Sequence, residues 1–403
     1  MRKLAAAILS CFLAVTAAKA QSAPELLTKH LYAGTLADGD RAFEAGAASG
    51  DAQAKAGQGM LRFVAAIEHL AQAMHRHGLQ TASGGPMVNL PVLRIPVPPK
   101  PKPEPLGYAQ FRAIFERFVD DLDKAESALA GVEEKDVKFS IDLLKVRLDL
   151  DGDGKAGDHE SLGELMNGLA PGMAPPQAPV AFDTADIYWL RGYARFLSAF
   201  TQFMLAHDFH DTFDKTFHIF FPNAGLPLAD KLSRAGNASP WSDPAIGDAI
   251  AFIHLINWQV ADPVRLADVR TRLKAMIEMS RKSWIAARKE TDNEAEWLPN
   301  PRQQGALGSP PVTDELINGW LAVMGEFELV LDGKRLMPHW RFGQGLNVKR
   351  MFEESKNFDL VLLIAGTDAV PWLEDGPVSS STDWDNLMRV FQGNFLGYAM
   401  WFN

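Results

Sequence analysis

Apolar residues recur at three- and four-residue steps over long stretches of this chain, and this period limits the folds that it can adopt. Residues 108–129, 188–205, 249–260 and 264–289 all follow it. A clear N-terminal case is the series Ala56, Met60, Phe63, Ile67, Leu70 and Met74. Such steps place apolar side chains along one face of an α-helix. We therefore expect an all-α fold, a multi-helix array or bundle.

Helix-end signals and a scarcity of strand signals support this expectation. Thr313 has the side chain of an N-cap residue and precedes two acidic residues, which suit the positive start of a helix. An Asp-Gly pair at residues 332–333 predicts where that helix ends. The short apolar run at residues 358–364 fits either a strand or a buried helix, because its periodicity does not separate the two.

Two proline-rich stretches divide the chain. Residues 91–106 form the first, and their polyproline run predicts an extended, semi-rigid linker. Residues 171–181 form the second break. These boundaries predict an N-terminal helical segment at 21–90, a helical region at 107–170 and a C-terminal helical domain at 182–403.

Residues 107–118 and 192–203 resemble each other. Both begin with Gly-Tyr-Ala and continue with phenylalanines at helical spacing. A duplicated helical unit would make the fold repeat-like, whereas aromatic helix faces also coincide by chance. Both interpretations stay open at this point.

The first twenty residues have the pattern of a secretory signal peptide. A short basic start precedes an apolar stretch at residues 4–17, and Ala18-Lys19-Ala20 matches the small-x-small cleavage pattern. Cleavage there would make Gln21 the first residue of a periplasmic or secreted protein. A lipoprotein anchored through Cys11 is the alternative interpretation.

Charge and cysteine content exclude several functional classes. A net charge of −10, from 50 acidic and 40 basic residues, opposes a nucleic-acid partner. Cys11 is the only cysteine and would be lost with the signal peptide, which excludes disulfides, thiolate catalysis and Cys-ligated zinc. No later stretch reaches about 18 consecutive apolar residues, so we expect no transmembrane segment. The partner, a protein or a small ligand, stays unknown.

An acidic loop at residues 149–160 carries the strongest functional signal. Calcium takes about six to eight oxygen ligands, and a twelve-residue loop supplies carboxylates from its positions 1, 3, 5 and 12. These positions hold Asp149, Asp151, Asp153 and Glu160. Lys155 offers its main-chain carbonyl at position 7, and Gly154 permits the sharp turn at position 6. We therefore predict a Ca²⁺ site made by Asp149, Asp151, Asp153, Lys155 and Glu160.

This loop resembles the loop of EF-hand calcium-binding proteins. The resemblance covers about thirty residues, because leucines at helical spacing flank the loop on both sides. It implies one EF-hand-type helix-loop-helix within the all-α fold. The loop departs from the EF-hand pattern at Ala156, where a β-branched aliphatic residue is usual, and no second loop follows to pair with it. A lone extracytoplasmic loop is typical of weak, permanently filled sites, which favours a structural calcium over a regulatory one.

Two further groups of residues have the chemistry of a catalytic or metal site. On one continuous helix, His207, Asp211, Asp214 and His218 would share a face and suit zinc or iron, with His210 close by. The acidic run Glu290, Asp292, Glu294 and Glu296 offers paired carboxylates of the kind that act as acid and base in glycoside hydrolysis. A buried aromatic helix and a solvated helix end are the corresponding structural explanations. His339-Trp340-Arg341 and the serines at 379–381 read as packed loops.

Two functional hypotheses from different classes follow. The first is an extracytoplasmic calcium-binding protein whose helical body acts as a binding or scaffold module. The second is an extracytoplasmic hydrolase with a His/Asp or paired-carboxylate site in the C-terminal half. The segment 297–303 and the closing Trp401-Phe402-Asn403 resemble exported bacterial proteins of uncharacterised function, a likeness that implies no activity. No catalytic residue is assigned, and enzymatic activity stays an open alternative.

Overall fold

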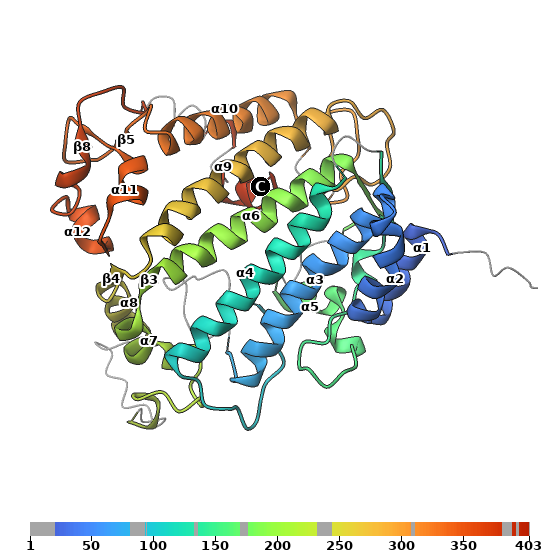
Figure 1. Ribbon diagram of the computed structural model, residues 1–403, viewed down its shortest axis with the longest axis horizontal. Helices are drawn as coiled ribbons and strands as arrows, with labels where there is room; N and C mark the ends of the chain where they lie inside the picture. Colours follow the sequence, from blue (N-terminus) through green and yellow to red (C-terminus); the bar gives the residue numbers. More distant parts are fainter. Residues whose placement is uncertain are drawn as a thin grey trace, which may run out of the picture.

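The fold of this protein is predominantly helical (Figure 1). The computed structural model describes residues 21–80, 93, 95–132, 136–169, 176–231, 244–307, 311–380, 389–391 and 395–402. Its α-helices are α1 (Ala23–Ala33), α2 (Leu36–Ala48), α3 (Ala52–Arg76), α4 (Tyr108–Ala130), α5 (Leu162–Leu169), α6 (Thr184–Ala206), α7 (His210–Thr216), α8 (Pro244–His254), α9 (Pro263–Ala287), α10 (Asp314–Leu331), α11 (Val348–Glu354), α12 (Leu360–Ala365) and α14 (Phe395–Phe402).

The strands are short and form three small antiparallel sheets. β1 (Lys138–Ile141) pairs with β2 (Val180–Asp183). The second sheet has the order β3 (His207–Asp208), β4 (Asn257–Val260) and β7 (Asn357–Asp359), and the third has the order β5 (Met337–Pro338), β6 (Gly345–Leu346) and β8 (Leu373–Glu374). The expectation of a helical protein is therefore confirmed, while a strictly all-α description is too narrow.

Helices α3, α4, α6, α9 and α10 lie side by side in this order, and each contacts the next (Figure 1). Neighbouring helices are antiparallel. Glu126, near the end of α4, meets Arg191 near the start of α6, and Ser283, near the end of α9, donates a hydrogen bond to the carbonyl of Ala185 at the start of α6. Among the described residues, none of these helices is both long and apolar enough to cross a membrane.

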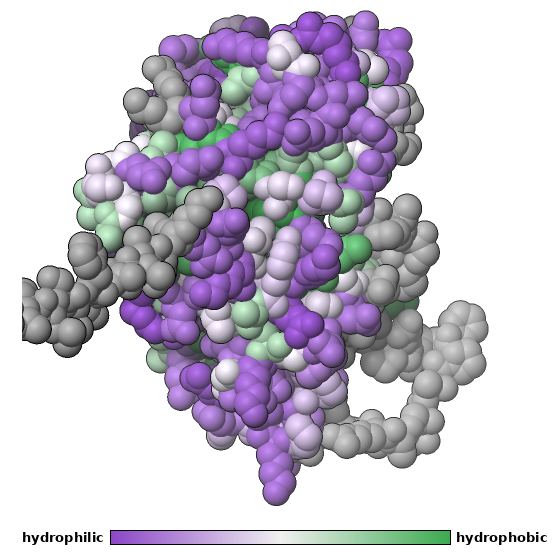
Figure 2. All heavy atoms as spheres, turned by 90° about the vertical axis from the view of Figure 1, so that its right-hand side faces the viewer, coloured by the Kyte–Doolittle hydropathy of each residue, from purple (hydrophilic) through white to green (hydrophobic). Residues whose placement is uncertain are grey.

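The remaining helices cover the two ends and one side of this array. α1 and α2 pack on α3 at one end, and the surface seen from that end is largely hydrophilic, with smaller hydrophobic areas scattered over it (Figure 2). α7, α8 and the β3–β4–β7 sheet lie at the opposite end. The C-terminal helix α14 packs on α9 and α10, where the ring of Phe402 contacts Trp284 and Trp320.

Most helices expected from periodicity are present, and two expectations need correction. The side chain of Thr313 accepts the N–H of Leu316 and caps α10, as predicted. Residues 249–260 do not form one helix, because α8 ends at His254 and residues 257–260 form β4. The run 358–364 is neither all strand nor all helix, since β7 passes directly into α12. The signal peptide predicted at 1–20 and residues 171–175 of the 171–181 break lie outside the described residues.

The two Gly-Tyr-Ala stretches occupy different places in their helices. Tyr108 is the first residue of α4, whereas Tyr193 lies in the interior of α6. The two stretches therefore begin at different points of their helices, which gives no support to a duplicated unit.

The described part of the proline-rich segment 91–106 lies against the end of α3. The main-chain N–H of Glu104 donates to the carbonyl of Arg76 at 3.0 Å, and that of Leu106 donates to the carbonyl of Ala224 at 2.9 Å.

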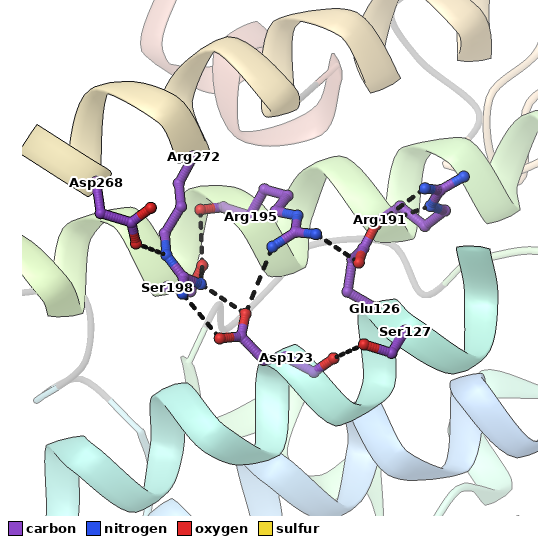
Figure 3. A network of polar contacts seen from close by, with 8 residues as sticks. All are labelled: Asp123, Glu126, Ser127, Arg191, Arg195, Ser198, Asp268 and Arg272. Carbon is purple, nitrogen blue, oxygen red and sulfur yellow. Dashed lines mark hydrogen bonds and ion pairs between the residues drawn. The ribbon is translucent and has the colours of Figure 1, made fainter.

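A polar network joins the three central helices through charges (Figure 3). The carboxylate of Glu126 on α4 accepts hydrogen bonds from Arg191 at 3.0 Å and from Arg195 at 2.6 Å, both on α6. Beside it, Asp123 on α4 accepts from Arg272 on α9 at 2.8 Å, and Arg272 also donates to the hydroxyl of Ser198. Because Glu126 and Arg191 are both buried, this network fixes which faces of α4 and α6 meet.

Replacing Glu126 with alanine should lower the free energy of unfolding by about 3 kcal/mol or more, since it removes the carboxylate that balances the buried charge of Arg191. Urea denaturation followed by circular dichroism measures this loss. Asp38→Ala is the matched control, because the Asp38–Arg41 pair is exposed and should contribute less than about 1 kcal/mol. Equal losses in the two variants would contradict the structural role assigned to Glu126.

Candidate functional site

The acidic loop 149–160 lies between a small sheet and α5. A single 3₁₀ turn, Leu143–Lys145, precedes it, and a second 3₁₀ turn, Asp158–Glu160, leads into α5. An isolated bridge between Arg147 and Ser161 closes its base. The predicted helix on the N-terminal side is therefore wrong. β1 ends at Ile141, so only a few residues separate it from the loop. In place of the expected helix, this segment forms the single turn Leu143–Lys145.

Three of the predicted ligands come together in this loop. Oxygen atoms of Asp149, Asp151 and Asp153 lie within 4.8 Å of one another. The carboxylate of Asp149 accepts the main-chain N–H groups of Gly152 at 2.8 Å and Gly154 at 3.0 Å, which wraps the loop around it. Both glycines have positive φ angles, 75° and 86°, a conformation that side chains disfavour. This arrangement fits an oxygen-preferring cation.

The other two predicted ligands lie differently. Glu160 is buried, and its carboxylate accepts the main-chain N–H groups of Leu150 and Gly157, each at 2.8 Å. It does not belong to the group of three aspartates. A bidentate contact to calcium would require Glu160 to exchange these amides for the ion. Lys155 donates its N–H to Asp153 at 2.8 Å, which keeps it at the rim of the same turn.

Helix α3 holds the loop through two residues that the sequence patterns did not identify. Glu68 accepts the main-chain N–H of Asp149 at 2.7 Å, and Gln72 donates to the carbonyl of Asp149 at 2.8 Å. Burial, assisted by the charges of Asp149 and Glu160, raises the pKa of Glu68 to about 7. Both residues lie on α3, whose apolar residues recur at helical spacing. The only signal for them in the sequence is that they are polar residues within this apolar pattern.

A large apolar cavity lies between the central helices and the C-terminal part of the chain. Its volume is about 530 Å³, within the roughly 300–1,000 Å³ typical of small-molecule pockets. Helices α6, α9, α10, α11 and α14 all contribute lining residues. Phe327 and Met337 belong to the lining and are also exposed to solvent, so the cavity opens to the surface beside them.

The cavity is elongated along α6. Its lining includes Tyr193, which lies in α6, and His207, which directly follows α6. These residues are fourteen positions apart, which corresponds to about 20 Å at 1.5 Å per residue. Side chains of Phe196 and Phe203 lie between them, and leucine, methionine and valine side chains from the other helices complete the wall. Polar groups are few, so the cavity suits a long molecule with little polar surface.

The histidines and aspartates between residues 207 and 218 do not converge. Helix α6 ends before His207, whose Nδ1 lies 2.7 Å from the carbonyl of Phe203, and its buried ring faces the apolar cavity. Asp211 is exposed and pairs with Lys215, while His218 is buried elsewhere in the aromatic core. The expectation of one continuous helix face was wrong, because the strand β3 interrupts it. Within the described chain, these residues form no metal-ligating group.

The acidic run 290–296 separates into two pairs. Glu290 and Glu296 turn inward, where their oxygens lie within 4.8 Å of each other and of Asp183. Asp292 and Glu294 turn outward, and both contact the ammonium group of Lys138. The sequence placed the four carboxylates in one run but gave no sign that Asp183, at the start of α6, would join two of them.

The other titratable loops have local partners. The Nε2 atom of His339 lies 3.1 Å from the carbonyl of Leu363, and the guanidinium of Arg341 stacks on the exposed ring of Trp340 at 4.4 Å. Ser379 donates a hydrogen bond to Glu326 at 2.5 Å. These contacts agree with packed loops.

Comparisons with known proteins give no relative for this chain. No protein-family model matches it, no curated protein shows significant similarity to its sequence, and no solved structure resembles its fold significantly. The chemistry of its sites is therefore argued from the contacts of the chain itself.

Proposed function

We propose that this protein is an extracytoplasmic binding protein for an elongated apolar ligand, held together by a structural calcium ion in loop 149–160. The single observation that supports the binding function best is the apolar cavity of about 530 Å³. Enclosed apolar surface of this size is costly to leave in contact with water, and a ligand that covers it gains hydrophobic free energy.

The calcium part of the proposal rests on the three grouped aspartates and on the contacts of the loop with α3. Asp149 links the two, because its side chain organises the loop while its main chain bonds to Glu68 and Gln72. A bound Ca²⁺ would neutralise the aspartates and fix the loop against α3. Without the ion, repulsion among the three aspartates would oppose the ordering of the loop.

The ligand class follows from the shape and polarity of the cavity. Its wall spans about 20 Å along α6, and its few polar lining residues include Tyr193, His207 and Ser355. A single chain of methylene groups with one polar head has this shape. We therefore propose an acyl-chain molecule as the ligand class.

The alternative function, an extracytoplasmic hydrolase, loses its His/Asp version because those residues lie apart. Its paired-carboxylate version stays a hypothesis. Glu290 and Glu296 lie together, but neither belongs to the lining of the apolar cavity. The binding function is therefore preferred.

Calcium should raise the melting temperature of the purified protein by a few degrees, because a ligand at ten times its Kd adds about 1.4 kcal/mol to the free energy of unfolding. The combined substitution Asp149→Ala and Glu160→Gln should abolish this rise. Thermal melting by circular dichroism in millimolar calcium and in chelator measures the effect.

Asp158→Asn is the matched control for this experiment. Asp158 lies in the same loop, but its carboxylate is exposed and pairs with Arg147, so its loss should leave the calcium response intact. An unchanged melting temperature of the wild-type protein in calcium would contradict the structural role. Calorimetric titration would then decide whether calcium binds at all.

The substitution Leu273→Trp should weaken binding of a dansylated fatty acid at least tenfold, because the indole fills part of the cavity in which Leu273 lies. Fluorescence titration of the probe measures this loss. Val264→Trp is the control, since Val264 is on the same helix, α9, but is 82% exposed and lies outside the cavity lining. A wild-type protein that does not bind the probe, or equal binding by Leu273→Trp, would refute the proposed ligand class.

A further inference from the structure

A group of four carboxylates, two of them buried and two half-buried, lies at the start of α6, apart from the loop 149–160. It consists of Asp183, Asp186, Glu290 and Glu296. Oxygens of Asp183, Glu290 and Glu296 all lie within 4.8 Å of one another. Glu296 is 2% exposed and Asp186 is 4% exposed, so solvent does little to separate their charges.

Three chain segments hold these side chains in place. Asp183 caps α6, accepting the N–H of Ala185 at 2.7 Å, and Asp186 accepts the N–H of Asp183 at 2.8 Å in return. Two main-chain hydrogen bonds fix Glu296. The N–H of Glu296 donates to the carbonyl of Gln304 at 3.0 Å, and the carbonyl of Glu296 accepts the N–H of Ala306 at 2.8 Å. The group is thus built on ordered main chain.

Among the described residues, no cation pairs directly with this group. In the part of the chain that the structure describes, no lysine or arginine forms an ion pair with any of the four carboxylates. The nearby Lys138 instead binds Asp292 at 2.5 Å and Glu294 at 3.3 Å, on the outer side of the loop. Neutral donors are few: Gln303 donates to Glu290 at 3.2 Å, and the N–H of Glu294 donates to Glu296 at 3.3 Å.

Asp186 adds an independent observation. Its Oδ1 atom is buried and has no hydrogen-bond partner among the described residues. Leaving a buried carboxylate oxygen without a partner is unfavourable, because the group loses its hydration and gains no hydrogen bond in exchange. Asp186 adjoins the three grouped carboxylates, because its Oδ2 atom lies 2.8 Å from the main-chain nitrogen of Asp183.

The same crowding acts on the two glutamates. Burial and the charge of Asp183 raise the pKa of Glu290 to about 9 and that of Glu296 to about 7. Asp183 and Glu290 also share a side-chain hydrogen bond, so a proton lies between these two carboxyl groups. That proton does not satisfy the Oδ1 atom of Asp186, which stays without a hydrogen-bond partner among the described residues.

We propose that Asp183, Asp186, Glu290 and Glu296 form a second metal site, which binds a divalent cation of the oxygen-preferring class. The ligand atoms are all carboxylate oxygens, and no histidine belongs to the group within the described residues. Such a donor set selects Ca²⁺, Mg²⁺ or Mn²⁺ over zinc or copper. Gln303 positions Glu290 for this role, because its other amide atom accepts the N–H of Asn300 at 2.8 Å.

This site is independent of the proposed calcium loop and of the apolar cavity. It joins the start of α6 to the segment that follows α9, so a bound ion would fix the contact between these two helices at one end. Trp297 follows Glu296 directly, which places a fluorophore beside the site.

The test starts from the Asp149→Ala, Glu160→Gln protein, in which the loop no longer competes for metal. Terbium luminescence sensitised by tryptophan, and calorimetric titration with Ca²⁺, Mg²⁺ and Mn²⁺, should show one remaining saturable site. Adding Glu290→Gln and Glu296→Gln should weaken that site at least tenfold. Asp292→Asn with Glu294→Gln is the matched control in the same segment and should leave binding unchanged, because these carboxylates face Lys138.

A stability measurement separates a loss of metal binding from a loss of the fold in each variant. In chelator at neutral pH, Glu290→Gln should leave the melting temperature close to that of the wild-type protein, because a pKa of about 9 keeps Glu290 protonated and neutral there. In metal, the wild-type protein should gain stability and the variant should not. No metal binding by the loop variant, or equal binding after the Glu290 and Glu296 substitutions in a folded protein, would overturn the proposal and assign the group to shared protons.

Discussion

Helix α6 is buried along most of its length, and the rest of the structure depends on how its polar groups find partners there. Its neighbours α4 and α9 lie on either side, and charged side chains cross both contacts. Glu126 receives Arg191 and Arg195 from α6, and Asp123 receives Arg272 from α9. Since an unpartnered buried charge costs several kcal/mol, these pairs admit only one alignment of the three helices.

The same helix supplies the walls of both internal sites. Its first turn carries Asp183 and Asp186 into the carboxylate group, and its last turns present Phe203 and His207 to the apolar cavity. One end of α6 therefore lies among carboxylates, and the other end lies among apolar side chains. The two ends therefore suit different ligands, in keeping with the proposed sites for a cation and for an acyl chain.

Periodicity in the sequence was enough to predict the long helices, because apolar residues recur at helical spacing in α4, α6, α9 and α10. It failed where the chain changes direction within an apolar run, as at residues 257–260, since short strands and buried helices share the same composition there. The Asp149–Asp153 turn was recognisable because its three aspartates lie close together in the sequence. Asp183 and Glu290 are 107 residues apart, and Glu68 is 81 residues from Asp149, so only tertiary packing brings them together.

The C-terminal helix α14 has a consequence for the order in which this protein folds. Helices α3, α4, α6, α9 and α10 follow one another both in the chain and in space, so each pair can pack as soon as both of its helices have been made. The indole of Trp189 instead donates to the main-chain carbonyl of Trp401, across 212 residues, and the indole of Trp401 donates to the main-chain carbonyl of Trp297. Residue 401 must be synthesised before these bonds exist. A chain cut short of Trp401 would keep its helices and lack the clamp that closes them.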